Sequence, residues 1–201
     1  MERLFNIIFL GSLSCLFFAR LFYGLIHKKA IFANPLVFLF FPYFPGLSLV
    51  GGVLGAGVFF GFLATRKKEL PLGRLADFFS IAFLGTMPVG FLGYFMFSED
   101  NFPAIKAGGL AITYLILFLV FLRFLLPQLL NGKFKEGTIA LLFLVSFSVV
   151  NLISNDFVKT SVLNYFRDLE NITLFLVLAV SIVLIFVQEN LLSKVKDREK
   201  K

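Results

Sequence analysis

Few side chains in this 201-residue chain combine chemical reactivity with a place inside an apolar stretch. Polar groups are costly within hydrocarbon, so those that occur there are candidates for a functional site. Arg20 is the first, because the planar fork of a guanidinium can hold a phosphate group. The alternatives for Arg20 are an arginine that extends to the membrane interface and one that pairs with an acid on a neighbouring helix. The other candidates are Ser48, Asp77, Asn151 and Glu99, the last at the edge of an apolar run.

The chain has too few histidines and cysteines for a metal site or for thiol-based catalysis. The chain has one histidine, His27, and one cysteine, Cys15. An internal disulfide, a cysteine-based metal site and a Cys–His catalytic pair are therefore not expected. His27 lies beside two lysines with no carboxylate adjacent in sequence, which favours a solvated loop residue over a general base. Nucleotide-binding glycine motifs are also missing, and we expect neither a metal nor another cofactor.

The composition places these residues in a membrane protein. The chain is 59% hydrophobic and 15% charged, with a mean hydropathy of +0.92. Soluble domains carry about 25% charged residues. A soluble fold of this length could not bury so much apolar surface, so the chain belongs in a bilayer.

Six apolar stretches approach or exceed the roughly 20 residues that a membrane-spanning helix needs. The expected spans are Leu4–Ile26, Pro45–Thr65, Leu75–Phe97, Ala107–Leu126, Gly137–Ile153 and Ile172–Leu192. We expect the first to be a span, because it is longer than the apolar core of a cleavable signal peptide, about 7–15 residues. The proline-containing segment Asn34–Phe44 is too short to cross and is expected to be re-entrant or interfacial.

The predicted fold class is therefore an all-α integral membrane protein, a polytopic bundle of about six transmembrane helices. Residues 1–192 are expected to form a single transmembrane domain, and residues 193–201 a basic cytoplasmic tail. The tail has no interleaved aromatic residues that could stack on bases, so nucleic acid is not an expected partner.

The basic residues predict the orientation, because the side richer in Lys and Arg faces the cytoplasm. Thirteen lie on one side of the six spans, against five on the other. The richer side holds Arg3, Arg66, Lys67, Lys68, Arg74, Arg123, Lys133, Lys135, Lys194, Lys196, Arg198, Lys200 and Lys201; the poorer side holds Lys28, Lys29, Lys106, Lys159 and Arg167. Both termini are expected to be cytoplasmic. The basic face could also attract anionic lipid headgroups, although a topology signal alone explains it.

Glycines gather in the second and third expected spans. Small residues let helices approach closely in lipid, so we interpret Gly51-x-x-x-Gly55 and Gly57-x-x-x-Gly61 as packing motifs. The alternative is that these glycines open backbone donors to a ligand.

The stretch GLSLVGGVLG, residues 46–55, resembles a signature of the prolipoprotein diacylglyceryl transferases, which reads roughly Gly-x-Ser-Phe-His-Gly-Gly-x-x-Gly. The resemblance covers about 170 residues in order. It also includes Ala19–Tyr23, Asn34–Leu36, Arg66–Lys68, Leu75–Asp77, Gly90–Glu99, Lys133–Gly137 and Leu169–Phe186. It implies a bacterial cytoplasmic-membrane protein, with phosphatidylglycerol and lipoprotein precursors as partners. The implied activity moves a diacylglyceryl group onto a cysteine thiol.

The chain departs from that family's pattern at the positions that carry its chemistry. Val50 replaces a histidine, Phe91 replaces an arginine, and Asn151 stands where a late arginine would sit. Tyr94 and Phe97 replace two asparagines, and the family's first span is missing. Removing one charge-stabilising donor from an active site costs about 10²–10³ in rate.

Three functions follow as alternatives. The favoured one is a member of that family whose activity is lost or altered, and which binds lipid or a partner helix. The lipid-binding candidates are Arg20, Ser48, Gly51, Gly52, Gly90, Gly93 and Asn151. The second is an active transferase with a rearranged site that uses Arg20, Glu99 and His27. The third is a small transporter, which the scarcity of paired intramembrane charges disfavours.

Overall fold

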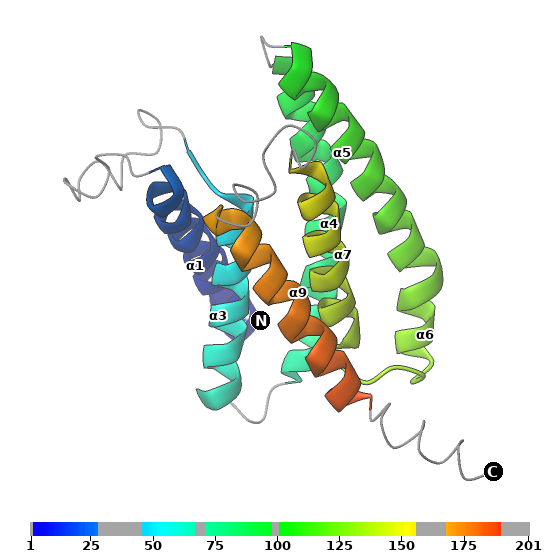
Figure 1. The fold of residues 1–201 in the computed structure, drawn as a ribbon. Helices are drawn as coiled ribbons and strands as arrows, with labels where there is room; N and C mark the ends of the chain where they lie inside the picture. Colours follow the sequence, from blue (N-terminus) through cyan, green and yellow to red (C-terminus); the bar gives the residue numbers. More distant parts are fainter. Residues whose placement is uncertain (1, 28–45, 67–70, 98–100, 156–167, 190–201) are drawn as a thin grey trace. The chain divides into compact units, whose positions relative to one another are not determined.

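The computed structural model describes residues 2–27, 46–66, 71–97, 101–155 and 168–189, and these ranges contain helices but no strand. The chain divides into two compact units, residues 1–70 and residues 71–201. Figure 1 shows the helices of each unit. The expected re-entrant segment Asn34–Phe44 and the basic tail lie outside the described residues.

The described residues of the first unit form a pair of packed helices, α1 (Glu2–His27) and α3 (Leu49–Arg66). They correspond to the first two expected spans. The second helix begins later than expected, because Gly46 has a φ of 149° that a helix cannot accommodate and Ser48 caps the first turn.

The second unit is built around α4 (Leu72–Phe97), which packs against both α5 (Asn101–Val120) and α7 (Thr138–Ser154). The last described helix, α9 (Leu169–Gln188), packs against α7. Asp168 caps α9, since its carboxylate accepts a hydrogen bond from the Glu170 backbone N–H at 3.2 Å.

The fourth expected span continues further than predicted, because α5 runs through a π-helical turn, η2 (Phe121–Leu125), into α6 (Leu126–Leu130). The backbone N–H of Leu126 donates to the carbonyl of Phe121, five residues back. Pro127 has no N–H to complete the usual ladder, and its ring crowds the preceding turn. The π turn accommodates this proline without ending the helix.

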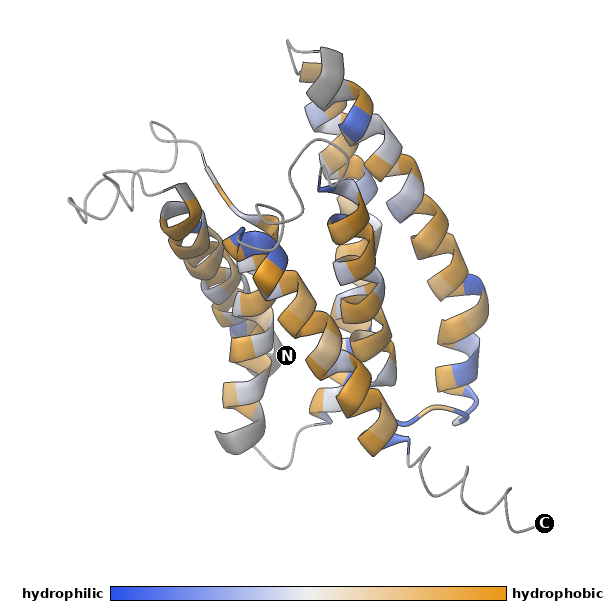
Figure 2. Cartoon of the chain, in the orientation of Figure 1, coloured by the Kyte–Doolittle hydropathy of each residue, from blue (hydrophilic) through white to orange (hydrophobic). Residues whose placement is uncertain are grey.

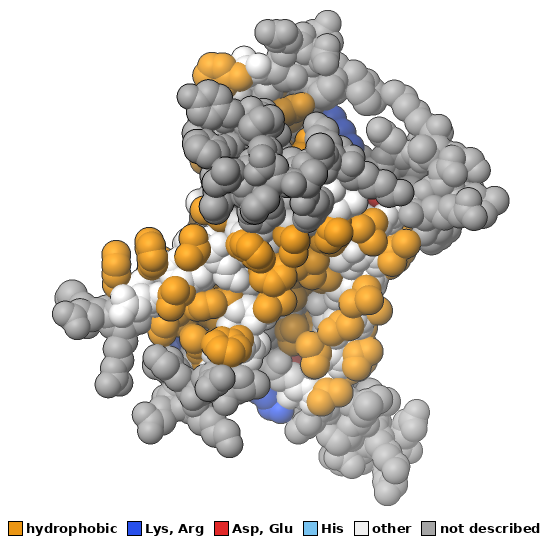
Figure 3. Space-filling view, turned by 90° about the vertical axis from the view of Figure 1, so that its left-hand side faces the viewer, with side chains coloured by type: hydrophobic (Ala, Val, Ile, Leu, Met, Phe, Trp, Pro, Cys, Tyr) orange, Lys and Arg blue, Asp and Glu red, His pale blue; other side chains and the backbone are white. Residues whose placement is uncertain are grey.

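The helices are apolar on the outside and carry their buried polar side chains inside. Arg20, Ser48, Asp77, Thr138, Ser148, Asn171 and Ser181 are buried, whereas large apolar residues such as Phe5, Val89, Ile112 and Val183 are exposed. The described helices are mostly hydrophobic along their length (Figure 2), and hydrophobic side chains are spread over the described surface in Figure 3. In water such a surface would be unstable, but in lipid it is what the hydrocarbon contacts.

Four of the described helices are long and apolar enough to cross a membrane, and the apolar stretches Leu49–Leu63 and Thr138–Ser154 are shorter. The prediction of an all-α membrane helical bundle is confirmed. The expectations of one domain over residues 1–192 and of cytoplasmic termini stay predictions.

Candidate functional sites

Arg20 is fully buried and binds the backbone ahead of α3. Its Nη1 donates a hydrogen bond to the carbonyl of Gly46 at 2.8 Å, and the neighbouring Ala19 carbonyl accepts one from the Ser48 backbone N–H at 3.0 Å. The Tyr23 ring fills the space where a side chain at Gly46 would lie. Arg20 therefore does not extend to water, and this nitrogen fixes the approach of the chain to α3.

Ser48, expected in a lipid site, has a structural task in the described geometry. Its hydroxyl oxygen accepts a hydrogen bond from the Gly51 backbone N–H at 3.3 Å, which satisfies one of the free donors in the first turn of α3. Ser48 is buried. In the described geometry this hydroxyl therefore caps α3.

The glycines of α3 divide into two faces. A Cβ on Gly51 would lie 2.6 Å from the Phe18 carbonyl oxygen, and one on Gly55 would lie 2.8 Å from that of Ser14. The Ser14 hydroxyl also donates to the Gly55 carbonyl at 3.1 Å. The packing prediction is confirmed for this pair. Gly52 lies at the edge of the same contact, where a Cβ would meet only ordinary van der Waals neighbours.

The second glycine pair has no packing partner within the described part of the first unit, so its interpretation as a packing motif stays a prediction. A Cβ on Gly57 or Gly61 would meet nothing within 4 Å. Each residue advances about 100° around a helix, so Gly57 lies about 240° from Gly51. The two motifs therefore cannot serve the same partner helix.

Asp77 is buried in α4 and caps a different helix. Its two carboxylate oxygens accept hydrogen bonds from the backbone N–H groups of Gly137 at 2.7 Å and Ala140 at 2.8 Å, at the start of α7. Gly137 has a φ of 93°, and an anion at a helix N-terminus is stabilised by the helix dipole. Asp77 thus joins α4 to α7.

Polar side chains close the same end of the second unit. The Glu189 carboxylate accepts hydrogen bonds from the Lys135 backbone N–H at 3.0 Å and the Thr138 hydroxyl at 2.7 Å. The Lys135 ammonium donates to the Gln188 carbonyl, and the Gln188 amide donates to the carbonyl of Glu136. These bonds tie the end of α9 to the start of α7.

Asn151 and Phe91, two of the positions at which the chain departs from the transferase pattern, meet at one buried residue, Tyr114. The Asn151 amide donates to the Tyr114 hydroxyl at 2.7 Å and to the Phe147 carbonyl at 2.8 Å. The Phe91 ring stacks on the tyrosine ring with centroids 5.6 Å apart and planes 3° apart. Sequence reasoning missed Tyr114; its only signal was a tyrosine within an aliphatic run.

A second polar contact joins α7 to α9. The Asn155 amide, at the C-cap of α7, donates to the Asn171 side-chain oxygen at 2.7 Å. Ser148 lies on the buried face of α7. Such polar contacts stabilise helix pairs in lipid, where no hydrophobic force draws helices together.

The remaining predicted site residues are not brought together by the described geometry. Gly90 and Gly93 have open space where a Cβ would lie. Glu99 and the His27 side chain lie outside the described residues. Among the residues that are described, no three His, Cys, Asp or Glu side chains gather in a way that could hold a metal ion.

Fold and sites together define an all-α membrane protein whose buried polar residues link its own helices. No protein-family model, curated protein or solved structure matches the chain.

Proposed function

We propose that this chain is a non-catalytic membrane protein with the helix layout of the prolipoprotein diacylglyceryl transferases, and that it binds membrane phospholipid without transferring it. The Phe91–Tyr114–Asn151 contact carries the proposal. At the two positions where the resemblance implies arginines, a phenyl ring and a neutral amide surround one tyrosine.

The transfer reaction needs a group that stabilises a phosphate leaving group and a group that activates a thiol. A stacked phenyl ring offers no donor, and the described Asn151 amide is bonded to Tyr114 and Phe147. Losing a single charge-stabilising donor costs about 10²–10³ in rate, and here two are replaced by neutral side chains.

Arg20 is poorly placed to supply the positive charge that the two replaced arginines would give to a substrate phosphate. One of its terminal nitrogens is bonded to the carbonyl of Gly46, and the side chain is fully buried. Freeing that nitrogen for a substrate phosphate would release the chain ahead of α3. This favours a structural task for Arg20 over the rearranged transferase.

By the same resemblance, the proposed location is the bacterial cytoplasmic membrane, and the proposed lipid is phosphatidylglycerol. Lipoprotein precursors are the second partner of this proposal, bound without being modified.

The test is a transfer assay with the purified full chain, phosphatidylglycerol vesicles and a peptide bearing the lipidation motif. An intact transferase serves as the positive control. We expect no lipidated peptide from the folded chain. Product above background would overturn the proposal, and Arg20→Lys and Glu99→Gln would then be the first variants to examine.

Lipid binding is tested separately by mass spectrometry of phospholipid that stays with the chain through purification in mild detergent. Gly52→Leu places a bulky side chain at the edge of the α1–α3 contact and should reduce retained lipid. Gly57→Leu, on the open face of α3, is the matched control. Equal retention by both variants would contradict a lipid site at the α3 glycines.

A further inference from the structure

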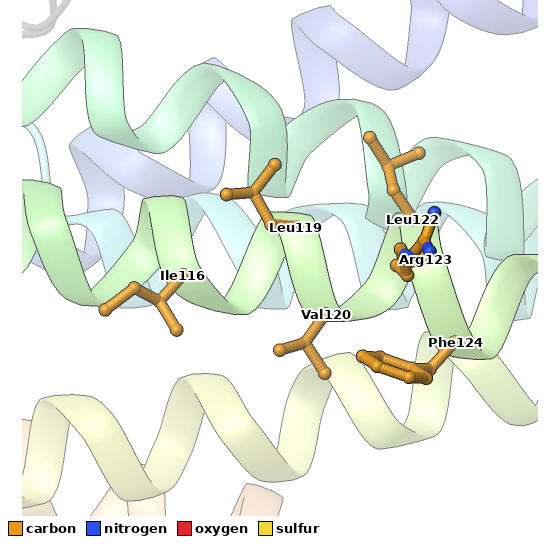
Figure 4. A pocket seen from close by; sticks show the side chains of 6 residues that line it. All are labelled: Ile116, Leu119, Val120, Leu122, Arg123 and Phe124. Atoms are coloured by element: carbon orange, nitrogen blue, oxygen red, sulfur yellow. The ribbon is translucent and has the colours of Figure 1, made fainter.

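The outer face of α5 and η2 carries an open depression of about 580 Å³. Its lining side chains project from a single helix (Figure 4) and are Ile116, Leu119, Val120, Leu122, Arg123 and Phe124. Five of the six are apolar, and the sixth is a permanent cation. The depression therefore combines a hydrocarbon-compatible surface with one positive charge.

Arg123 has an unusual environment for a charge. It lies within the apolar span Ile105–Leu130, seven residues, or about 10 Å, before the end of that helix. Its side chain is exposed, and within the described ranges it takes part in no hydrogen bond or ion pair. Arg74, by contrast, pairs with Glu136 at 2.7 Å. A guanidinium surrounded by hydrocarbon is stabilised by an anion that comes to it or by extension to the headgroup layer.

The backbone marks the same place. Arg123 is the central residue of the π turn, in which Leu126 bonds back to Phe121. Such turns within α-helices are rare and occur frequently at functional sites. The turn, which accommodates Pro127, also contains three of the residues that line the depression, Leu122, Arg123 and Phe124.

We infer that this depression binds an anionic phospholipid, with its phosphate on the Arg123 guanidinium and an acyl chain along Leu119 and Ile116. The polarity of the face fits this occupant. Arg123 is nearer the helix end that leads to Lys133, and Ile116 lies about 10 Å deeper along the axis. The guanidinium fork matches two phosphate oxygens.

Other occupants fit the face less well. A free phosphate ion would leave the apolar lining unused. A second helix would meet large side chains and a charge, whereas close helix contacts in lipid favour small residues. The site is separate from the Tyr114 contact and requires only that the chain spans a membrane, so it stands whether or not the proposed function does.

The absence of tryptophan from the sequence allows a direct test. Leu119→Trp places the only indole in the depression, and the full chain is then reconstituted in vesicles that contain bromine-labelled lipid chains. Quenching by labelled phosphatidylglycerol is compared with quenching by labelled phosphatidylcholine. We expect the anionic lipid to be preferred about fivefold, which is the effect of one basic residue near a membrane surface.

Arg123→Gln in the Leu119→Trp background should abolish the preference, and Arg123→Lys should retain part of it. Lys133→Gln removes a neighbouring charge that does not line the depression and should leave the preference intact. Leu176→Trp on α9, which is similarly exposed, should report no preference.

Four results would overturn the inference. The first is equal quenching by both lipids at Leu119→Trp, and the second is a preference that survives Arg123→Gln. The third is weak quenching by both lipids relative to Leu176→Trp, which would mean that another helix covers this face. Loss of the preference in Lys133→Gln as well would assign it to general surface charge and likewise reject the site.

Discussion

Tyr114 and Asn151 form a hydrogen bond between α5 and α7. The contribution of this bond to the stability of the protein depends on what else the two groups could bond to. The two residues are 37 positions apart, and the tyrosine is fully buried. In lipid an unbonded polar group has no water to turn to, but the unfolded helix in the membrane also finds other partners. Asn151 has such an alternative already, the Phe147 carbonyl in its own helix.

Replacing Tyr114 by Phe should therefore cost about 1 kcal/mol of unfolding free energy, because the amide loses only one of its two acceptors. The stacking of Phe91 on the ring is kept. The measurement is unfolding in mixed micelles, with a double-mutant cycle that adds Asn151→Ala. Thr113→Val on the same helix is the control, since that hydroxyl is exposed and bonds only to the Gly109 carbonyl. A coupling energy near zero would show that the bond contributes nothing.

Sequence reasoning found Asn151 but assigned it to lipid, and it did not find Tyr114. A residue type and its neighbours indicate that a polar group is buried, but the partner depends on how two helices are rotated about their axes. That rotation is set by the packing of all the side chains between them. For the same reason, the Asp77–Gly137 bond could not be predicted from two positions 60 residues apart.

At the scale of elements, α7 is stabilised at its start by a side chain from α4. Gly137, at the N-cap, has no side chain to accept from the first turn, so the Asp77 carboxylate does so instead. A Cβ on Gly73 would lie 2.8 Å from the Glu136 carbonyl carbon, which means that α4 and the start of α7 are in close contact there.

Asp77→Ala should lower the unfolding free energy by about 1–3 kcal/mol, since it leaves two part-buried N–H groups at the start of α7 without this acceptor. Asp77→Asn retains one acceptor oxygen and should lose less. Glu136→Gln is the control; it breaks only the exposed ion pair with Arg74, which is worth about 0–1 kcal/mol. Thermal unfolding in detergent measures all three. Equal shifts for Asp77→Ala and Glu136→Gln would contradict the capping role.

The α1–α3 contact can be tested with the sole cysteine as a reporter. A Cβ on Gly55 would lie 3.1 Å from the Cys15 Cα, so this thiol belongs to a residue of the packed face. Gly55→Leu should separate the helices and raise the rate of maleimide labelling of Cys15 several-fold. Gly57→Leu, on the open face, should leave the rate unchanged. Faster labelling in both variants would mean that the contact between α1 and α3 does not depend specifically on the close packing at Gly51 and Gly55.

Helix positions followed from hydropathy because a span must be apolar over a fixed length, whatever it packs against. The ends were less predictable. Hydropathy did not reveal that α5 continues through a π turn past Pro127, since a proline also ends helices. The glycine pattern indicated close packing for Gly51-x-x-x-Gly55, but it did not tell that Gly57 lies on a different face of α3, which is open in the first unit.

At the scale of the whole molecule, apolar residues lie outside and polar links lie within each unit. The polar links described here join helices of the same unit, as Arg20 does in the first and Asp77 in the second. A membrane supplies the hydrocarbon contacts that the exposed apolar surface needs. The stability of the protein in detergent should therefore depend on how well the micelle covers these helices.

The orientation of the chain is a prediction at this scale. Thirteen basic residues against five across alternating loops should place residues 66–74 and 131–136 in the cytoplasm. Fusions of a cytoplasm-fluorescent reporter and a periplasm-active phosphatase after residues 70, 100, 135 and 165 should therefore alternate. Fluorescence is expected after 70 and 135, and phosphatase activity after 100 and 165.

Charge is the physical cause, so a charge change should alter the result. The strongest cytoplasmic retention signal in the first half of the chain comes from Arg66, Lys67, Lys68 and Arg74. If all four are neutralised, fusions after residue 70 should give both fluorescence and phosphatase activity. Neutralising Lys28 and Lys29 on the expected outer side should leave the outcome of the fusion unchanged or sharpen it. If the wild-type fusions give the opposite alternation, both the termini and the side to which Arg123 presents its charge are reversed. The lipid at Arg123 would then come from the outer leaflet.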